Sequence, residues 1–422
     1  MQNIATKSNN QGAKMQSTTP QNPPKILIIG GGYGGLKVAL GLQRKLKSKA
    51  HITLISKHDY HYQTTLLHKV AIGTLGSRKA RIFYRKILDP QKVGFIKDKI
   101  IELCPQENKV RGNGGEYHYD YLVIALGFKP DSFGIKGVDK HAYKLSSLNA
   151  ALKLTKNIEN KFKEYTHTKN QKDLEVVVCG TGFTGIEFTA ELATQLDELC
   201  LICGIDRSLP KLTCIGRAKQ ILPVFEPSLA KTAQNKLEKY GVNVLTGTDI
   251  KEIQAGKVLA QRDGIDIQIE GNTIIWSAGV KGSDIIEKSI IPNKKGRIPV
   301  NAQLQCEPYP NIYVVGDSAL ATDKDVIHAP TAQLSAQMGD YIAELLIAKL
   351  KGKDFSKPFK FNHRGTVCSI GHTDGVGVVY HKNVKGEFAA FMKNTIENKW
   401  LFSLGGFPMV FKKGQFRYRT SN

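Results

Sequence analysis

Two glycine motifs, 150 residues apart, constrain the fold of this chain more than any other feature. The first, Gly30–Gly35, follows the apolar run Lys25–Ile29 and opens a segment with apolar residues at helical spacing. The second, Gly180–Gly185, follows the run Leu174–Cys179 and opens a similar segment. Glycines in the pattern Gly-x-Gly-x-x-Gly allow a tight turn, close approach of the backbone to a pyrophosphate, and tight packing of helix on strand. Two such units predict two dinucleotide-binding sites.

The predicted fold class is α/β, with two Rossmann-like dinucleotide-binding domains built around these motifs. The next strand of each unit is expected at His51–Ser56 and at Lys211–Ile215. Further parallel strands are predicted by three apolar runs that end in glycine: Leu122–Gly127, Ile274–Gly279 and Ile312–Gly316. A helix is expected from Thr331 to about Lys349, after Pro330. This arrangement suits a flavoprotein in which one site holds FAD and the other brings NADH or NADPH to it.

Both units lack the acidic residue that usually binds the ribose hydroxyls at the end of the second strand. The first unit has Ser56 and Lys57 there, and the second has Gly216 and Arg217. An arginine can bind a 2′-phosphate through two charge-assisted hydrogen bonds, whereas a carboxylate would repel it. Arg217 therefore points toward NADPH, and a solvated surface arginine is an equally good alternative.

The charge balance indicates an anionic partner. The chain has 60 Lys and Arg against 37 Asp and Glu, a formal net charge of +23. Between Lys393 and Arg419, basic residues are interspersed with aromatic and aliphatic ones, which suits an interface with anionic lipid. Nucleic acid and simple core packing are the alternatives. Because no nucleic-acid-binding motif accompanies the segment, nucleic acid is not expected as a partner.

The remaining composition favours a reducing, cytosolic environment without membrane spans. No run of about 18 apolar residues is present, so no transmembrane helix is expected. Residues 1–24 are polar and lack the apolar centre of a signal peptide, which predicts a disordered tail. The 7 cysteines are sparse. Cys200 and Cys203 form a C-x-x-C without a second pair, so they are expected to be structural and no metal site is predicted.

Gln333 and Gln337 lie four residues apart and share one face of the expected helix. Their amides could line a pocket for an acceptor that carries carbonyl groups. The spacing alone, however, favours an ordinary polar helix face.

Taken together, these motifs make the chain resemble the type II NADH:quinone oxidoreductases, which are single-subunit respiratory dehydrogenases that do not pump protons. The resemblance extends from about Lys25 to the C-terminus. The segments that carry it are Gly30–Gly35, His58–His68, Ala125–Phe128, Gly180–Glu187, Trp276–Val280, Val315–Asp317, Ala332–Gln337 and Phe407–Phe416.

The resemblance implies a division of the chain into domains. Residues 25–135 and 300–350 would bind FAD non-covalently, residues 136–299 would form an inserted NAD(P)H-binding domain, and residues 351–422 would form a small membrane-docking region. Two electrons would pass from NAD(P)H through FAD to a membrane quinone. The protein would be peripheral, on the cytoplasmic side of the inner membrane, and a homodimer is one option for its assembly.

The resemblance also assigns roles to single residues. It places the quinone pocket where the helix of Gln333 and Gln337 meets the C-terminal region. Glu187 matches a family carboxylate near the flavin, and Lys393 matches a family lysine near the quinone. Both are candidates for stabilising charge or relaying protons. Gly216 departs from the family pattern, which usually has an acid there, and this leaves the choice between NADH and NADPH open.

The candidate site residues form three groups. The catalytic candidates are Glu187, Gln333, Gln337 and Lys393. The FAD-binding candidates are Gly30, Gly32, Tyr33, Gly34, Gly35, Ser56, Lys57, Thr64, Ala125, Gly127, Gly316, Asp317, Ala332 and Gln333. The NAD(P)H-binding candidates are Gly180, Gly182, Phe183, Thr184, Gly185, Glu187, Gly216, Arg217, Ala278 and Gly279.

Three rival functions stay open at this point. A sulfide:quinone oxidoreductase needs a redox-active cysteine pair beside the flavin, and Cys306 and Cys368 are the available thiols, but the intact Gly180–Gly185 motif argues against it. A disulfide reductase would have its cysteine pair after the first unit or before the second motif, where none is present. A nucleotide-sensing flavoprotein without turnover also fits the basic tail.

Overall fold

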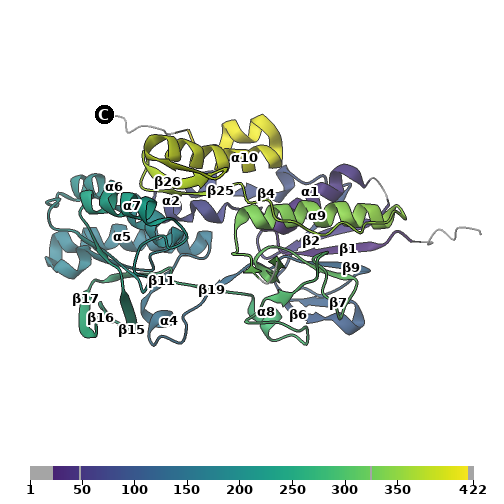
Figure 1. Cartoon of the computed structure of the whole chain (residues 1–422), viewed down its shortest axis with the longest axis horizontal. Coiled ribbons are helices and arrows are strands. Elements are labelled where there is room, and N and C mark those ends of the chain that lie inside the picture. Colours follow the sequence, from purple (N-terminus) through teal and green to yellow (C-terminus); the bar gives the residue numbers. More distant parts are fainter. Residues whose placement is uncertain (1–21, 47–48, 324–325, 417–422) are drawn as a thin grey trace, which may run out of the picture.

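The computed structural model describes residues 22–46, 49–323 and 326–416. Its two main sheets each have five strands that run parallel to one another (Figure 1). The tail predicted at residues 1–24 lies almost entirely outside the described residues. The first sheet has the strand order β21-β9-β1-β2-β5, and all neighbouring strands run parallel. Its strands are β1 (Lys25–Ile29), β2 (His51–Ser56), β5 (Val93–Lys97), β9 (Tyr121–Ile124) and β21 (Ile312–Val314).

The second sheet repeats this plan with the order β11-β18-β12-β13-β14, again all parallel. Its strands are β11 (Tyr143–Lys144), β12 (Glu175–Cys179), β13 (Lys211–Ile215), β14 (Val242–Leu245) and β18 (Thr273–Trp276). The two glycine motifs follow β1 and β12, the central strands of the two sheets. The predicted α/β class with two Rossmann-like units is therefore confirmed.

Each unit also carries an inserted antiparallel sheet of three strands, which precedes β9 in the first unit and β18 in the second. The strands of these sheets are β6 (Ile100–Cys104), β7 (Lys109–Gly112), β8 (Glu116–His118), β15 (Thr248–Gln254), β16 (Lys257–Arg262) and β17 (Ile265–Glu270). The β1 strand, between two parallel neighbours, has four fully buried aliphatic residues in succession, Ile26–Ile29. Such a run is typical of a strand that is covered on both faces.

Helices cover the two parallel sheets. They are α1 (Tyr33–Lys45) and α9 (Ala332–Leu350) on the first sheet, and α5 (Leu148–Thr168), α6 (Phe183–Cys203) and α7 (Pro227–Lys239) around the second. In Figure 1, α1 and α9 lie side by side. They approach so closely that a Cβ at Gly41 would lie 2.5 Å from the Cβ of Ala343. The predicted helix at 331–349 is thus found, and α6 extends far enough to contain Cys200 and Cys203.

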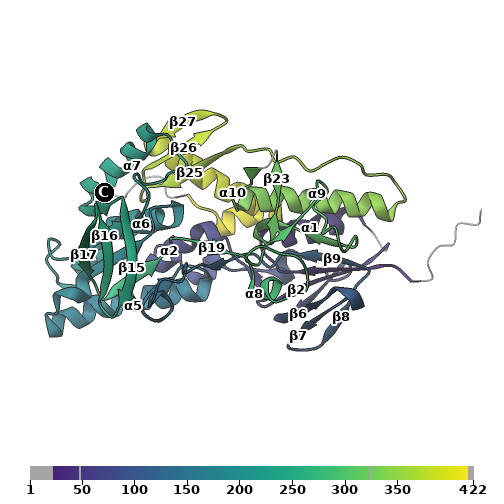
Figure 2. The ribbon, with the colours of Figure 1, turned by 60° about the horizontal axis from the view of Figure 1, so that its bottom comes forward.

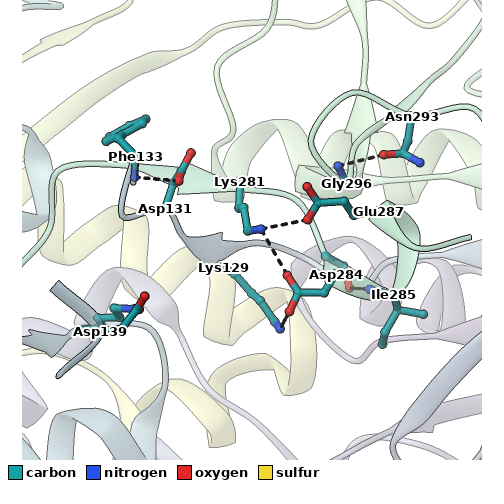
Figure 3. A network of polar contacts seen from close by, with 12 residues as sticks. Lys129, Asp131, Phe133, Asp139, Lys281, Asp284, Ile285, Glu287, Asn293 and Gly296 are labelled. Carbon is teal, nitrogen blue, oxygen red and sulfur yellow. Dashed lines mark hydrogen bonds and ion pairs between the residues drawn. The ribbon is translucent and has the colours of Figure 1, made fainter. Parts of the chain in front are cut away.

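The chain crosses between the two sheets twice, and the crossings pair with each other as an antiparallel ribbon. The ribbon consists of β10 (Lys129–Pro130) and β19 (Val280–Lys281). Figure 3 shows that Asp284 binds Lys129 on one crossing and Lys281 on the other, at 3.5 Å for Lys281. Lys281 also contacts Glu287 at 2.8 Å. These ion pairs are partly exposed, so they fix the path of the two crossings more than they add stability.

The C-terminal region joins both units. Its three antiparallel strands are followed by the long helix α10 (Gly386–Lys413), which lies above α1, α9 and α2 (Leu67–Ile72) in Figure 1. The strands are β25 (Gly365–Ser369), β26 (Gly375–Val379) and β27 (Lys382–Lys385). Figure 2 shows β25 to β27 beside α7 of the second unit, while α10 continues toward α9 of the first. None of the described helices is long and apolar enough to span a bilayer.

Helix α10 is interrupted near its end. Gly405 and Gly406 have non-helical backbone angles, and Pro408 follows. Proline lacks the N–H group that a helix interior needs, and glycine tolerates the positive φ of 65° at Gly406. Up to Lys413, the basic, aromatic segment singled out in the sequence therefore consists of two helical pieces separated by a kink, a form that the sequence analysis did not predict.

Candidate active site

A cavity of about 470 Å³ lies at the carboxyl ends of the strands of the first sheet, where α/β folds commonly bind ligands. Many of the FAD candidates line it. They are Gly30, Gly32, Tyr33, Gly34, Ser56, Lys57, Thr64, Ala125, Gly127, Gly316 and Asp317. Three other candidates, Gly35, Ala332 and Gln333, are not among its lining residues. Residues that the sequence analysis missed include His61, Tyr84 and Ser335.

The glycine turn of this cavity has the geometry that the motif predicts. Gly30 has φ of 104°, and a Cβ there would lie 2.1 Å from the carbonyl oxygen of Ala125. A Cβ at Gly35 would lie 2.0 Å from the carbonyl oxygen of Gly30, so this glycine lets α1 pack on β1. A Cβ at Gly32 would meet nothing within 4 Å. The turn therefore leaves open space at the N-terminus of α1, where phosphate groups bind.

Asp317 is the acidic group of this cavity. Burial raises its pKa to about 6, although Arg297 opposes that shift. Its Oδ1 atom has no hydrogen-bond partner within the described residues. A buried carboxylate oxygen without a partner is costly unless a ligand hydroxyl or amide satisfies it. The open glycine turn and this unsatisfied oxygen, at two positions of one cavity, fit a flavin dinucleotide.

Lysines surround the end of this cavity at which β2 stops. Lys57, Lys99 and Lys129 all line it. Burial lowers the pKa of Lys57, and the charges of Lys129 and Lys99 lower it further. Lysines thus stand where the sequence lacks the usual acid, and Asp98 and Asp284 line the same cavity, with Asp284 paired to Lys129.

The second glycine turn repeats the geometry of the first. Gly180 has φ of 133°, and a Cβ at Gly185 would lie 1.9 Å from the carbonyl oxygen of Gly180. A Cβ at Gly182 would again meet nothing within 4 Å. Phe183 packs edge-on against Phe225 with 5.3 Å between ring centroids. Thr184 lies in the first turn of α6, while Ala278 and Gly279 follow β18, the strand beside β12.

The structure gives a steric reason for the glycine at position 216. A Cβ at Gly216 would lie 2.5 Å from the Oγ1 atom of Thr181, inside the glycine motif itself. Thr181 therefore excludes a larger residue, acidic ones included, from the position that usually binds ribose. The neighbouring Arg217 is exposed and comes directly after β13.

A buried network of charges lies where α6, α10 and β25 meet. The Nζ atom of Lys393 lies 2.9 Å from the Oε1 atom of Glu187, and both residues are buried. Ser369 donates to the same oxygen through its backbone N–H, at 3.1 Å. Burial alone would raise the pKa of Glu187, but Lys393, His68 and Ser369 together hold it below its ordinary value. Burial likewise opposes ionisation of Lys393, whereas Glu187 and Glu397 raise its pKa well above normal.

Glu397 extends this network toward the flavin cavity. It lies 3.7 Å from Lys393, one helical turn earlier on α10. It accepts hydrogen bonds from Gln63 at 2.5 Å and from Thr65 at 2.9 Å. Thr65 in turn contacts the hydroxyl of Tyr33, which lines the cavity, at 3.2 Å. The spacing of four residues between Lys393 and Glu397 could have revealed this pair in the sequence.

The network continues from Glu187 toward the surface. His68 lies 3.7 Å from the Oε2 atom of Glu187, and burial lowers its pKa to about 4, which the nearby Glu187 and Glu191 oppose. Glu191, also buried, accepts a hydrogen bond from Thr74 and lies 3.4 Å from the partly exposed His372. The sequence analysis missed His68, Glu191 and His372, because they come from three separate elements.

The two candidate glutamines bind backbone. The amide of Gln337 donates to the carbonyl of Asn362 and accepts from its N–H, both at 2.9 Å. Gln333 accepts from the N–H of Arg364 at 2.8 Å and donates to the carbonyl of Gly365 at 3.4 Å. They thus hold the chain that enters β25 against α9. This is the meeting place of helix and C-terminal region that the resemblance implies.

The cysteines show no paired arrangement. All seven are free thiols. Cys306 belongs to the apolar core around the first sheet, and Cys368 to that around the second. Among the described residues, no group of His, Cys, Asp or Glu is arranged to hold a metal ion.

Comparison with known proteins identifies relatives along most of the chain. Residues 24–336 match the family described as pyridine nucleotide-disulphide oxidoreductase. The chain is 38% identical over 401 residues to a type II NADH:quinone oxidoreductase of Staphylococcus saprophyticus, a match that covers 94% of this chain and 100% of the relative. It is 37% identical, with the same coverage, to the protein of that name from Staphylococcus aureus.

Solved structures share the fold. The structure of NDH2 from Plasmodium falciparum in complex with NADH matches with a TM-score of 0.83 and 21% identity, over 93% of this chain and 98% of that one. The sulfide:quinone oxidoreductase of Aquifex aeolicus matches with a TM-score of 0.75 and 20% identity, over 90% and 91%. At these identities the likeness concerns the fold alone.

Proposed function

Because this chain belongs to the type II NADH:quinone oxidoreductase family, we propose that it oxidises NADH with a bound FAD and passes two electrons to a quinone. The observation that carries this proposal is the buried pair of Glu187 and Lys393, which lies between two glycine turns on two separate sheets and connects to the flavin cavity through Glu397. A pair of dinucleotide sites supplies donor and cofactor, and the buried ion pair supplies charge where an acceptor is reduced.

In this proposal the domains divide as the sequence predicts. Residues 25–135 and 300–350 bind FAD, residues 136–299 bind the nicotinamide nucleotide, and residues 351–422 attach the protein to the membrane. Bound FAD would supply the redox chemistry, the uptake of a hydride from the nicotinamide and the release of two electrons to the quinone. The glycine turn at Gly32 receives the pyrophosphate, and Asp317 binds the flavin through its unsatisfied oxygen.

Reduction of a quinone to a quinol also consumes two protons. We assign the proton handling to Glu187 and Lys393: both protons come from solvent, the Lys393 ammonium can pass a proton to the reduced quinone, and the ionised Glu187 can take up a proton and pass it on in turn. The support is the contact of 2.9 Å between them and their nearly complete burial. Gln333 and Gln337 position the chain that enters β25 and thereby shape the quinone pocket.

We further propose that α10 docks on an anionic lipid surface from the cytoplasmic side, which is where the quinone would enter. The support is a set of exposed apolar side chains on α10 and directly after it: Phe388, Phe391, Ile396, Phe402, Phe407, Phe411 and Phe416. Exposed lysines such as Lys399 and Lys412 flank them. Apolar anchors beside cations bind the boundary between lipid headgroups and acyl chains. A homodimer in solution would be detected by analytical ultracentrifugation.

The nucleotide preference follows from the site at Gly216. Since Thr181 excludes an acid there and Arg217 is exposed next to it, we propose that NADPH is also accepted. Arg217 would bind the 2′-phosphate, so Arg217→Ala should lower kcat/KM for NADPH by about tenfold while leaving that for NADH within about twofold.

The test is steady-state oxidation of NADH and of NADPH by the purified, FAD-loaded protein with a short-chain quinone. Turnover with NADH supports the proposed function. If neither nucleotide reduces the flavin, the proposed function is wrong, and sulfide should then be tried as donor. That alternative has little support here, because Cys306 and Cys368 lie in different apolar cores.

A further inference from the structure

A chain of hydrogen bonds leads from the C-terminal helix to the first glycine turn. The indole Nε1 atom of Trp400, on α10, lies 3.0 Å from the Nε2 atom of His61. The Nδ1 atom of His61 lies 3.2 Å from the carbonyl oxygen of Gly31. The hydroxyl of Tyr84 donates to the same carbonyl at 2.8 Å. His61 and Tyr84 are buried, so water does not compete for these bonds.

The direction of each bond is fixed by the chemistry of the donors. An indole N–H can only donate, so the Nε2 atom of His61 must accept. Burial lowers the pKa of His61 to about 4, although the bond to Gly31 opposes that shift. The ring is therefore neutral near pH 7 and carries one proton, which must lie on Nδ1. His61 then donates to the Gly31 carbonyl, and Trp400 selects the tautomer that can do so.

The Gly31 carbonyl belongs to the same peptide group as the N–H of Gly32. In a trans peptide the C=O and N–H groups point in opposite directions. Two donors that hold the Gly31 oxygen on one side thereby fix the direction of the Gly32 N–H on the other. Gly32 lines the flavin cavity, and open space lies beside its Cα.

We propose that Trp400 is a positioning residue for FAD: through His61 it fixes the peptide of Gly31 and Gly32, and so presents the Gly32 N–H to the pyrophosphate. This inference rests on the proposed binding of FAD in the first cavity. Its consequence is that flavin affinity depends on the packing of α10 against the first unit. Tyr33 takes part in that packing, because its ring lies 4.6 Å from the ring of Trp400.

The ring contacts of Trp400 and its N–H donor can be separated by substitution. His61 also contacts Tyr33, with ring centroids 5.2 Å apart, and Trp400, at 5.4 Å. Phenylalanine at position 400 would keep much of this ring packing and remove only the donor. A phenylalanine at position 84 would remove the second donor to the Gly31 carbonyl independently of α10.

The experiment measures the dissociation constant of FAD for the full-length protein, by the recovery of flavin fluorescence on dilution of the holoprotein. Trp400→Phe should raise it by about three- to tenfold, the effect of one buried hydrogen bond. Tyr84→Phe should raise it by a similar factor. Trp276→Phe is the matched control, because it removes an indole N–H whose bond, to the carbonyl of Asp131 at 2.8 Å, lies away from this turn. Its FAD affinity should match the wild type.

A second readout separates positioning from general loss of structure. In ¹⁵N NMR spectra of the wild type, His61 should be the tautomer with the proton on Nδ1, and Trp400→Phe should shift it toward a mixture. The inference is overturned if Trp400→Phe binds FAD as the wild type does, or if Trp276→Phe weakens FAD equally. If the wild type itself binds no FAD, the proposed function fails instead, which is a different result.

Discussion

At the scale of single residues, the carboxylate of Glu187 connects three separate parts of the chain. Its oxygens contact Lys393 on α10, Ser369 on β25 and His68 on α2. A buried carboxylate with these partners stays ionised, and a buried lysine beside two carboxylates stays protonated. The pair can therefore present opposite charges to a ligand in a region from which water is excluded.

We expect Glu187→Gln to separate the two half-reactions. The amide keeps the size of the side chain but removes its charge and its ability to hold a proton. Quinone turnover should fall by about a hundredfold, the lower end of the effect of losing an acid–base group, while anaerobic reduction of the flavin by NADH changes little. Stopped-flow absorbance of the flavin measures both steps. Glu198→Gln, an exposed site on the same helix, is the control. Equal effects on both steps would contradict the assigned role.

His68 should make the folded protein less stable as the pH falls. Its pKa is lowered to about 4 in the native state, mainly by burial, against about 6.5 in the unfolded chain. At a pH between these two pKa values, the unfolded chain binds a proton that the native state does not. The free energy of unfolding therefore falls as the pH falls, by up to about 1.4 kcal/mol per pH unit. His61 acts in the same direction, whereas Asp317, with its raised pKa, partly offsets it.

The measurement compares urea unfolding of the wild type and of His68→Gln from pH 7 to pH 5, at one fixed FAD concentration. The wild type should lose more stability over this interval than the variant. Identical losses would mean that His68 titrates normally in the native state.

At the scale of elements, α10 combines two roles. Its inner face carries Lys393 and Glu397, while its outer face and its last turns expose phenylalanines. The break at Gly405 and Gly406 turns the final piece, which carries Phe407 and Phe411. The phenylalanines proposed to contact lipid and the buried network therefore lie on different sides of one helix.

The double variant Phe407→Ser with Phe411→Ser should bind vesicles that contain anionic lipid at least about tenfold more weakly. The reason is that each serine would bury much less apolar surface in the lipid than the exposed phenylalanine it replaces. Co-sedimentation with vesicles measures this. Ile265→Ser on β17, equally exposed but in the second unit, should bind as the wild type does. Unchanged binding of the double variant would place the lipid contact elsewhere.

Single elements also show how much of the fold and of the candidate site can be predicted from the sequence. The strands at 25–29, 51–56 and 211–215 were predicted to the residue, because buried parallel strands are short, mainly apolar runs and each of these is followed by a glycine or a lysine. The glycine turns and Asp317 followed from the same patterns. Glu397, His61 and Trp400 did not, because their roles depend on contacts between residues more than 300 positions apart, which no local periodicity encodes.

At the scale of the whole molecule, the net charge of +23 favours approach to an anionic surface. We expect binding to anionic vesicles to weaken as salt rises from about 0.1 M to about 1 M, because the Debye length shortens from about 10 Å to about 3 Å. Neutral vesicles should bind more weakly and with less dependence on salt. A salt-independent affinity for both would contradict an electrostatic contribution.

The strand order of the first sheet has a consequence for synthesis of the chain. The edge strand β21 and the covering helix α9 come after the whole second unit, whose parallel sheet lies within residues 143–276. On the ribosome, the second sheet can close as soon as β18 emerges, whereas the first must wait for Ile312–Val314 and α9. We expect the inserted unit to fold first, and the N-terminal part of the first unit, residues 25–135, to keep an open sheet edge, a natural target for chaperones, until β21 and α9 have been made.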